Sequence, residues 1–565
     1  MNVAARPGEI RAIPSGPSAV PDAAGTNLWS ADPAFARLLP LYLPADLLVV
    51  LRPHLERLGA LAGGRLDALA GMADRNPPEL RHRTRRGEDS QSVEYHPAYR
   101  EMEALAFGEL GLAAMSHRAG VFGWPAPLPP AAKYAFTFLF AQAEFGLLCP
   151  VNMTDSLTRT LRKFGDPALV ERYLPVLASQ DMDALHQGAM FMTEQGAGSD
   201  ISATAVLAEP QPDGSWALHG DKWFCSNPDA ELAMVLARRV DGGPGMRGVS
   251  LFLLPRTLPD GTPNRHRIVR LKDKLGTRSM ASGEVTLNGA TAWLVGEPEA
   301  GFRQMADMVN SSRLSNGVRA AGMMRRAVTE ALFVARHRVA FGRRLVEMPL
   351  MRRQLTKMLM RAEQARAMVF QTAEVLRRSD SGEEGAYALL RILTPLVKFR
   401  ACRDARQVTG DAMEVRGGCG YIEEWPEARL LRDAHLGSIW EGTSNIVALD
   451  VLRAASRENS LPALEAHLRG LLGNGAALPE ALPALNRAIA LAGRAGEDPA
   501  LARQAASALY HLTSAAVMAW EAERIGNVHR AALARMVLRH RILPRDPLGA
   551  EDPDAAGLGD LLEAA

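Results

Sequence analysis

The spacing of apolar positions changes character along the chain. Residues 30–187 place apolar side chains three or four positions apart, as in ERYLPVLASQ, which predicts amphipathic helices. Residues 188–300 instead carry short β-rich segments such as GVSLFLLP and EVTLNGATAWLV, separated by PDG and DGG turns. That pattern predicts a compact antiparallel β unit. The helical period returns over 301–457 in long, arginine-studded segments that suit a bundle.

These segments together predict an α+β fold. We expect an N-terminal helical domain, a middle antiparallel β-barrel or sandwich, a C-terminal helical bundle and, over 458–565, an appended helical region with an acidic tail. The Pro- and Gly-rich residues 1–29 predict a flexible tail. No G-x-G-x-x-G follows a predicted strand and no G-x-x-x-x-G-K-[ST] occurs, which argues against Rossmann and P-loop nucleotide sites.

Charge and cysteine usage narrow the class of protein. The 65 basic and 63 acidic side chains give a formal charge of +2, so no global field draws the chain to nucleic acid or to an anionic membrane. The four cysteines lie far apart, so we expect no disulfide scaffold and no metal site, and a cytoplasmic location fits. The longest apolar stretch, 134–150, is too short to cross a membrane.

Two stretches of the β unit have residues suited to a planar ligand with polar edges. MTEQGAGSD, 192–200, is small and hydroxylated, which lets backbone amides approach a phosphate or a ring edge; a solvent turn explains it equally well. DKWFCSN, 221–227, offers an aromatic face at Phe224 beside a hydroxyl at Ser226. Core packing of these aromatics is the alternative interpretation, and the residues alone favour it.

Two stretches of the helical bundle could approach a ligand or a neighbouring chain. RVAFGRR, 338–344, supplies Arg338, whose guanidinium can pair with a pyrophosphate; a solvated helix end explains it nearly as well. GGCG, 417–420, lets the backbone lie close to a ligand, although a tight turn between helices is equally consistent.

A single carboxylate stands out in SIWEGTSNI, 438–446. Glu441 lies between a Trp and a Gly and precedes a run of hydroxyl and amide side chains. Taken alone, Glu441 reads as an exposed acid near a helix start, where Thr443 or Ser444 could cap the helix.

The order of these motifs resembles the acyl-CoA dehydrogenase flavoprotein family. The matching stretches include MTEQGAGSD, KWFCSN, LKDKLGTRS, RVAFGRRL, GGCGYIEEWPEARLLRD and IWEGTSNI. NPPELRHR, EYHPAYREM, LLCPVNMT and the appended C-terminal region resemble the AidB-like, adaptive-response branch of this family. The resemblance implies the same order of domains that the hydrophobic pattern predicts.

The resemblance also implies an FAD site shared between subunits. Its flavin walls would include Met192, Thr193, Ser199, Phe224, Cys225 and Ser226. Trp440, Thr443 and Asn445 would close over the cofactor, although the family more often has Gln at the position of Asn445. Four further residues match family positions that touch FAD bound mainly to a neighbouring subunit: Arg338, Phe341, Gly417 and Gly418. This match implies a homo-oligomer, most often a tetramer built as a dimer of dimers.

By the same resemblance Glu441 is the catalytic base, which removes the α-proton of an acyl thioester while the β-hydrogen leaves as hydride to flavin N5. In a minority of the family the base lies on an earlier helix, immediately before an Arg. The matching pair here is Ser312-Arg313, and Ser312 cannot be that base, so Glu441 is the one candidate that the resemblance offers. The expected activity is therefore an FAD-dependent oxidoreductase acting on an acyl-CoA or a related thioester.

The AidB-like branch offers an alternative function, a DNA-binding protective flavoprotein with vestigial dehydrogenase activity. Residues 458–565 hold ten arginines and thirteen acids, and at about 100° per residue Arg524, Arg535 and Arg539 face one way. Weak, salt-sensitive phosphate binding through these three arginines is one interpretation, and a solvated helix face is the other.

Overall fold

The computed structural model describes residues 20–546, 548–549 and 553–565. Most of the expected flexible tail, residues 1–19, lies outside these ranges. Residues 20–29 correct the expectation, since Leu28 and Trp29 are buried and the Gly25 amide donates to the carbonyl of Gly63 at 2.7 Å. The packed part of the chain therefore begins before residue 30.

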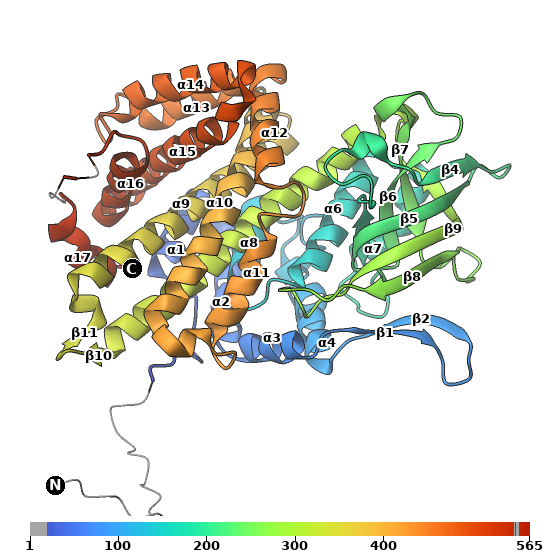
Figure 1. Ribbon diagram of the computed structural model, residues 1–565, viewed down its shortest axis with the longest axis horizontal. Helices are drawn as coiled ribbons and strands as arrows, with labels where there is room; N and C mark the ends of the chain where they lie inside the picture. The colour runs from blue at the N-terminus through green and yellow to red at the C-terminus, as the bar shows by residue number, and fades with distance from the viewer. Residues whose placement is uncertain (1–19, 547, 550–552) are drawn as a thin grey trace, which may run out of the picture.

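The N-terminal region is mainly helical, with one exception. Residues 79–94 form an antiparallel hairpin of Glu79–Arg83 (β1) and Asp89–Glu94 (β2) rather than the expected helix, and β1 alternates between exposed and half-buried positions as a strand does. The hairpin extends away from the bundle beneath the larger sheet (Figure 1). The helices are α1 Pro33–Leu38, α2 Ala45–Gly63, α3 Arg65–Arg75, α4 Pro97–Glu103, α5 Pro130–Phe140, α6 Leu148–Phe164 and α7 Pro167–Leu177.

The middle region is a seven-stranded sheet in the order β3-β5-β4-β6-β7-β9-β8, and a further β5–β9 pairing curls it toward a barrel. Most pairs are antiparallel as expected, but β6 runs parallel to both β3 and β4. The strands are β3 Gly188–Phe191, β4 Leu207–Pro210, β5 Trp216–Ser226, β6 Leu232–Arg239, β7 Val249–Pro255, β8 His266–Leu271 and β9 Ser282–Leu294.

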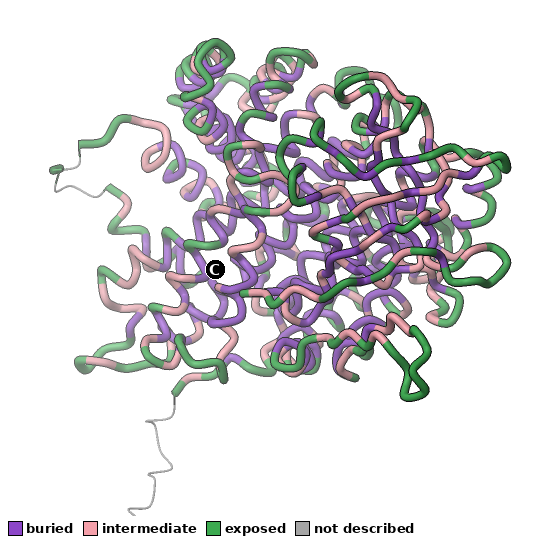
Figure 2. The backbone as a smooth tube through the Cα atoms, turned by 45° about the vertical axis from the view of Figure 1, so that its right-hand side comes forward, coloured by how far each residue is buried: buried purple, intermediate pink, exposed green. Residues whose placement is uncertain are grey.

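Strands β6 and β7 are apolar along their whole length because both of their faces are covered. Alternate side chains of β6, such as Val235 and Ala237, lie in the core of the sheet. The intervening ones, such as Met234 and Leu236, join the core of the helices. The two strands therefore fix the β region against the bundle, where buried backbone dominates in Figure 2.

The C-terminal bundle is built on three long helices that pack along one another. Buried residues occur on almost every turn and face of α8, so it forms the centre of the bundle. The elements are α8 Gly301–His337, the short hairpin β10 Val339–Ala340 and β11 Arg343–Arg344, α9 Pro349–Asp380, α10 Ala386–Arg416, α11 Pro426–Leu436 and α12 Ser444–Arg457.

The appended region is helical and packs against the bundle rather than standing apart (Figure 1). Tyr42 donates to Glu521 at 2.6 Å, and the buried Arg530 pairs with both Glu521 and Glu363 at 2.5 Å. These contacts tie it to the N-terminal region and to α9. The helices are α13 Ser460–Leu472, α14 Ala481–Glu497, α15 Ala502–Ile525, α16 Val528–Arg541 and α17 Leu558–Glu563.

Buried arginines join the N-terminal helices to the bundle. Arg326 of α8 pairs with Asp67 of α3 at 3.0 Å and with Glu330 at 2.8 Å. Arg416 continues the network to Glu330 at 2.7 Å and to Glu427 at 2.5 Å. Removing one partner of such a buried pair leaves an uncompensated charge, so the network fixes how these helices meet.

A search for helices long and apolar enough to cross a membrane finds none in the part of the chain that the structure describes.

Close packing of α8 against α5 predicts that Gly322→Ala destabilises the protein. A Cβ on Gly322 would lie 2.6 Å from the carbonyl oxygen of Phe138 and 2.9 Å from Cβ of Ala141. Since a helix backbone must then shift, we expect a loss of about 1–3 kcal/mol in the free energy of unfolding. Gly470→Ala on α13 is the matched control, because no atom lies within 4 Å of its Cβ; helix propensity favours it by about 0.5–1 kcal/mol. Chemical denaturation measures both, and equal stabilities would contradict the packing argument.

Candidate functional site

Glu441 lies in the short loop between α11 and α12, in an unusual backbone conformation. Its φ of 53° is in the left-handed region, which a non-glycine residue adopts at a cost of about 1–3 kcal/mol. Thr443 occupies the N-cap position of α12 but makes no capping hydrogen bond through its side chain. Simple helix capping therefore does not account for the shape of this loop.

Both carboxylate oxygens of Glu441 accept hydrogen bonds from α8. The hydroxyl of Ser312 donates to one oxygen, and the side-chain amide of Asn316 donates to the other. Ser312 and Asn316 are fully buried and lie four residues apart, so they share one face of the helix. The rotamer of the carboxylate is thereby fixed by the most buried helix of the bundle.

The backbone of the loop is held as firmly as the side chain. Arg313 donates through Nε to the carbonyl of Glu441 at 3.1 Å and pairs with Asp450 of α12 at 2.7 Å. Lys398 of α10 donates through Nζ to the carbonyl of Gly442. Burial lowers the pKa of Lys398 to about 8. Three helices therefore hold the strained conformation in place.

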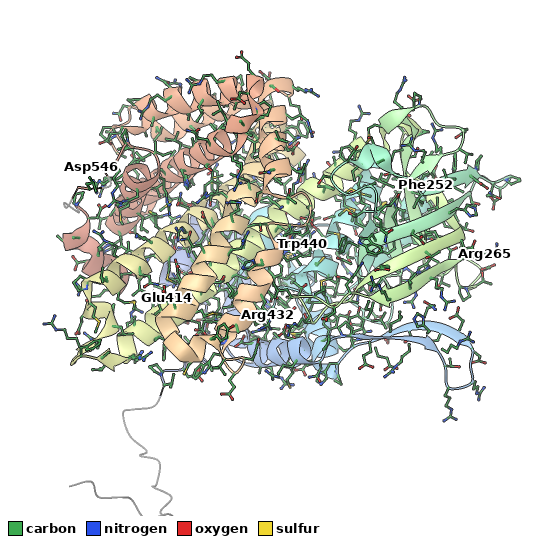
Figure 3. The ribbon with its side chains drawn as sticks, in the orientation of Figure 1. Phe252, Arg265, Glu414, Arg432, Trp440 and Asp546 are labelled. Atoms are coloured by element: carbon green, nitrogen blue, oxygen red, sulfur yellow. The ribbon has the colours of Figure 1, made fainter. Side chains whose placement is uncertain are left out.

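An arginine lies beneath the loop, against a pair of stacked aromatic rings. Trp440 and Phe145 stack with ring centroids 5.8 Å apart, and the guanidinium carbon of Arg319 lies 4.9 Å from each centroid. Arg319 is fully buried and donates to Asn316 at 2.8 Å. Two buried nitrogens lack partners among the described residues, Nη1 of Arg319 and Nε1 of Trp440. Figure 3 shows Trp440 on the side of the bundle that faces the sheet.

The N-terminal helices and the sheet reach the same place through Cys149 and Ser226. The thiol of Cys149, on α6, is buried beside Arg319 and the hydroxyl of Ser226, and its pKa is raised by burial. Lys274 follows β8 and donates to the carbonyl of Met280 at 2.7 Å and to Ser282 at 3.2 Å. Burial lowers the pKa of Lys274 to about 8. Three regions of the chain thus converge around Glu441.

The sheet brings the two predicted flavin-wall stretches together. The amide of Trp223 donates to the carbonyl of Thr193 at 2.8 Å, and Met190 pairs in register with Ser226. Phe224 is 57% exposed, so it is not the core residue that its aromatic character alone suggested. Met192 is half-buried and Ser199 is exposed.

Cys225 is an exception among the predicted wall residues. Its side chain is fully buried in the core of the sheet. The Cys225 thiol therefore does not face a ligand on the surface of the sheet, and only the backbone of Cys225 could contact a cofactor there.

The predicted neighbour-contacting residues gather at the end of the bundle away from the sheet (Figure 1). Arg338 donates to the carbonyl of Arg416 at 3.0 Å, directly before Gly417, and Gly418 is exposed. Phe341 forms the turn between β10 and β11 at a φ of 53° and is 98% exposed. One chain therefore has two separate sets of candidate ligand-binding residues.

Several residues around Glu441 were missed by sequence reasoning. Ser312 was considered only as a possible base, and Asn316, Arg319, Lys398 and Cys149 were not singled out. Residues 312, 316 and 319 share one face of α8, but the surrounding stretch 310–319, NSSRLSNGVR, is polar on several faces, so the local pattern does not single them out. The contributions of α6 and α10 depend on tertiary packing and have no local signature.

The arginines proposed for DNA contact are unevenly available. Arg535 is exposed and Arg524 lies 5.7 Å from the ring of Trp520, but Arg539 pairs with Asp554. Arg530 is buried between two glutamates. DNA binding through Arg524, Arg535 and Arg539 stays a prediction, weakened by the pairing of Arg539.

Within the described ranges no group of three or more His, Cys, Asp and Glu side chains could hold a metal ion.

Three protein-family models match successive parts of the chain. They describe the adaptive response protein AidB N-terminal domain over residues 18–184, the acyl-CoA dehydrogenase middle domain over 189–290 and the acyl-CoA dehydrogenase C-terminal domain over 299–456.

Individual relatives agree with the family models. AidB of Escherichia coli is 36% identical over 401 residues, which cover 69% of this chain and 71% of AidB. Acyl-CoA dehydrogenase family member 11 of Caenorhabditis elegans is 32% identical over 459 residues, 79% of this chain and 74% of the relative. The crystal structure of Caenorhabditis elegans ACDH-11 in complex with C11-CoA superposes with a TM-score of 0.87 at 28% identity and covers 96% of both chains.

The fold and the family membership predicted from the sequence are therefore confirmed. The chain belongs to the acyl-CoA dehydrogenase family of oxidoreductases, in its AidB-like branch.

Proposed function

We propose that the protein is an FAD-dependent dehydrogenase of acyl-CoA dehydrogenase type in which Glu441 removes the α-proton of an acyl thioester. The observation that carries this proposal is the fixation of Glu441, whose carboxylate and backbone are both held by buried groups of α8 and α10. An acidic residue that only precedes a helix would not require a strained φ and four buried hydrogen-bonding partners around its loop.

The residues present fit a flavin. Phe224 offers an exposed aromatic face near the end of β5, and the half-buried Ser226 offers a hydroxyl beside Cys149, close to Arg319 and Glu441. The unpartnered Nε1 of Trp440 and Nη1 of Arg319 are donors that a polar ring edge or a carbonyl could satisfy. When bound, FAD would supply the acceptor for the hydride that leaves the β-carbon.

The chain's own groups would then perform the proton chemistry. Glu441 takes the α-proton, which is only weakly acidic beside a thioester, so the base must be oriented before the reaction. Ser312 and Asn316 supply that orientation, because each donates to one carboxylate oxygen. A donor aimed at the thioester carbonyl would stabilise the developing enolate, and the buried donors beside Trp440 are suited to this task.

A CoA thioester is the proposed substrate class. The support comes from the chain's near-complete superposition on ACDH-11, which was crystallised with C11-CoA.

A homo-oligomer, most often a tetramer in this family, is also proposed. In one chain Phe224 belongs to β5 of the sheet, whereas Phe341 forms the turn between β10 and β11, which lie at the end of the bundle away from the sheet (Figure 1). Both sets can contact one FAD only if a second chain contributes the Phe341 end. The exposed apolar side chains Val339, Phe341, Leu350 and Tyr421 at that end suit burial against a partner.

Replacing Glu441 by Gln should abolish substrate oxidation and leave the cofactor bound. Anaerobic addition of a panel of acyl-CoAs should bleach the flavin of the wild type, and Glu441→Gln should slow this at least about 100-fold, the usual contribution of a general base. Glu424→Gln changes an exposed carboxylate outside the site and should bleach normally. Wild-type rates in the Glu441 variant, or bleaching by no thioester in the wild type, would refute the proposal.

Lys398 should make flavin reduction pH-dependent. Its pKa is lowered to about 8, so the ammonium that holds Gly442 is present below this pH and is lost as the pH rises through it. The bleaching rate should therefore fall above pH 8. Lys398→Met should lower the rate at pH 7 and remove the fall. Lys274 has the same lowered pKa, so Lys274→Met is the matched control and should keep the fall. A fall that persists in Lys398→Met would exclude this role.

Substituting Arg338 should weaken cofactor binding without affecting the base. If Arg338 contacts FAD held by a neighbouring chain, Arg338→Ala should raise the dissociation constant for FAD about tenfold, the effect of one lost charge-assisted contact. Arg343→Ala changes an exposed arginine on the same hairpin and should bind FAD normally. Light scattering reports the oligomer in parallel. A monomer that binds FAD normally would contradict the shared site.

A further inference from the structure

A pocket lies in the appended region. It is bounded by α14, α15 and the C-terminal end of α16, and its volume is about 610 Å³. Arg400 of α10 forms part of its wall. Small-molecule sites commonly have volumes of about 300–1,000 Å³. The pocket is therefore large enough for a small organic ligand.

The charged side chains of this pocket all have the same sign. Its described lining contains no carboxylate and includes Arg400, Arg487, Arg494 and Arg541, with His511 and His540. Arg400 is paired with Asp404 at 2.8 Å and His540 with Asp554 at 2.9 Å. Arg487, Arg494 and Arg541 make no ion pair with the described residues. Such a concentration of unpaired cations favours a multiply charged anion.

Arg541 forms part of the pocket wall, where its charge is poorly compensated. It is more than half buried, and Nε has no hydrogen-bond partner among the described residues. Burial, together with Arg361 and Arg400, lowers its pKa. A buried guanidinium nitrogen without a partner is costly unless an acceptor binds there.

His511 supplies a directed donor. Its ring is 4% exposed, and Nδ1 lies 3.0 Å from Nε2 of Gln364. An amide nitrogen only donates, so Nδ1 accepts and the neutral ring carries its proton on Nε2. Burial and three arginines keep the ring neutral by lowering its pKa well below the usual value. Because no partner for Nε2 is found in the described chain, this N–H is free to donate to a ligand in the pocket.

The rest of the lining is apolar. Ala484, Ala488 and Leu491 contribute one wall from α14, and Ala508, Leu512 and Ile542 contribute another. Arg487 and Arg494 lie seven residues apart on α14 and flank this wall, since they share one face of the helix. The pocket thus combines cationic side chains with a hydrocarbon surface.

We propose that this pocket binds a small organic phosphate ester, with the phosphate against Arg487, Arg494 and Arg541 and the organic group on the apolar wall. Arginine forks match phosphate oxygens, and a dianion uses several unpaired guanidinium groups better than a carboxylate does. The inference does not rest on the role of Glu441.

Helix α10 separates the new pocket from the candidate base. Lys398 reaches the Glu441 loop, whereas Arg400 lines the pocket. Because they are two residues apart on a helix, these side chains point to nearly opposite sides of α10, about 160° apart. The two sites are therefore distinct but share one rigid element.

Calorimetric titration of the full-length, FAD-saturated protein with phenyl phosphate tests the proposal. We expect saturable binding at one site per chain, weaker at high salt, with weaker binding of inorganic phosphate and none of phenol. Arg487→Gln/Arg494→Gln should raise the dissociation constant at least about tenfold. Both arginines are exposed, so the variant should keep its melting temperature and its flavin bleaching. Arg535→Gln, an exposed arginine outside the pocket, is the matched control and should bind as the wild type does.

Four outcomes would overturn the proposal. These are the absence of saturable phenyl phosphate binding, an unchanged affinity in the double variant, equally tight binding of benzoate, and duplex DNA that requires Arg487 and Arg494 but is not displaced by phenyl phosphate. The last result would assign these arginines to a nucleic-acid surface instead.

Discussion

The structure around the site depends on the burial of a polar row on α8. Ser312, Arg313, Asn316 and Arg319 lie in the centre of the bundle, where an unsatisfied donor costs about 1–3 kcal/mol. The loop that carries Glu441 satisfies most of them, since its carboxylate and carbonyl accept from three of these side chains. The same bonds hold the loop in a conformation that a non-glycine residue avoids. The same hydrogen bonds therefore stabilise the bundle and orient the Glu441 carboxylate.

The remaining donors explain why all parts of the chain are needed. Arg319 lies against both Phe145 of the N-terminal region and Trp440, and its Nη1 has no partner among the described residues. The neighbouring side chains Cys149 and Ser226 come from α6 and from the end of β5. Because β6 and β7 are buried on both faces, the sheet cannot move away from the helices without exposing apolar surface. The site thus exists only at the junction of the three regions.

The appended region also contains buried arginines, which differ in whether acidic side chains compensate their charge. Arg530 is fully compensated by Glu363 and Glu521, and it fixes α16 to the bundle. Arg541, at the end of the same helix, has no such compensation. Burial with partners makes an arginine structural, whereas burial without partners next to an open pocket suits it to bind an anion. Helix α10 contacts both this pocket, through Arg400, and the Glu441 loop, through Lys398.

The sequence by itself determined the succession of helices, sheet and helices, because apolar periodicity is a local property. It also marked Glu441, Phe224, Ser226 and Arg338 by their motifs. It did not determine the hairpin at 79–94 or the burial of Cys225, since a short alternating strand gives a weak signal and the inward face of β5 is fixed by register. Only the tertiary structure brought Ser312, Asn316 and Lys398 to the Glu441 loop, and Arg487, Arg494 and Arg541 to one pocket. These residues come from the separate helices α8, α10, α14 and α16, and which helices meet is decided by packing rather than by a local pattern.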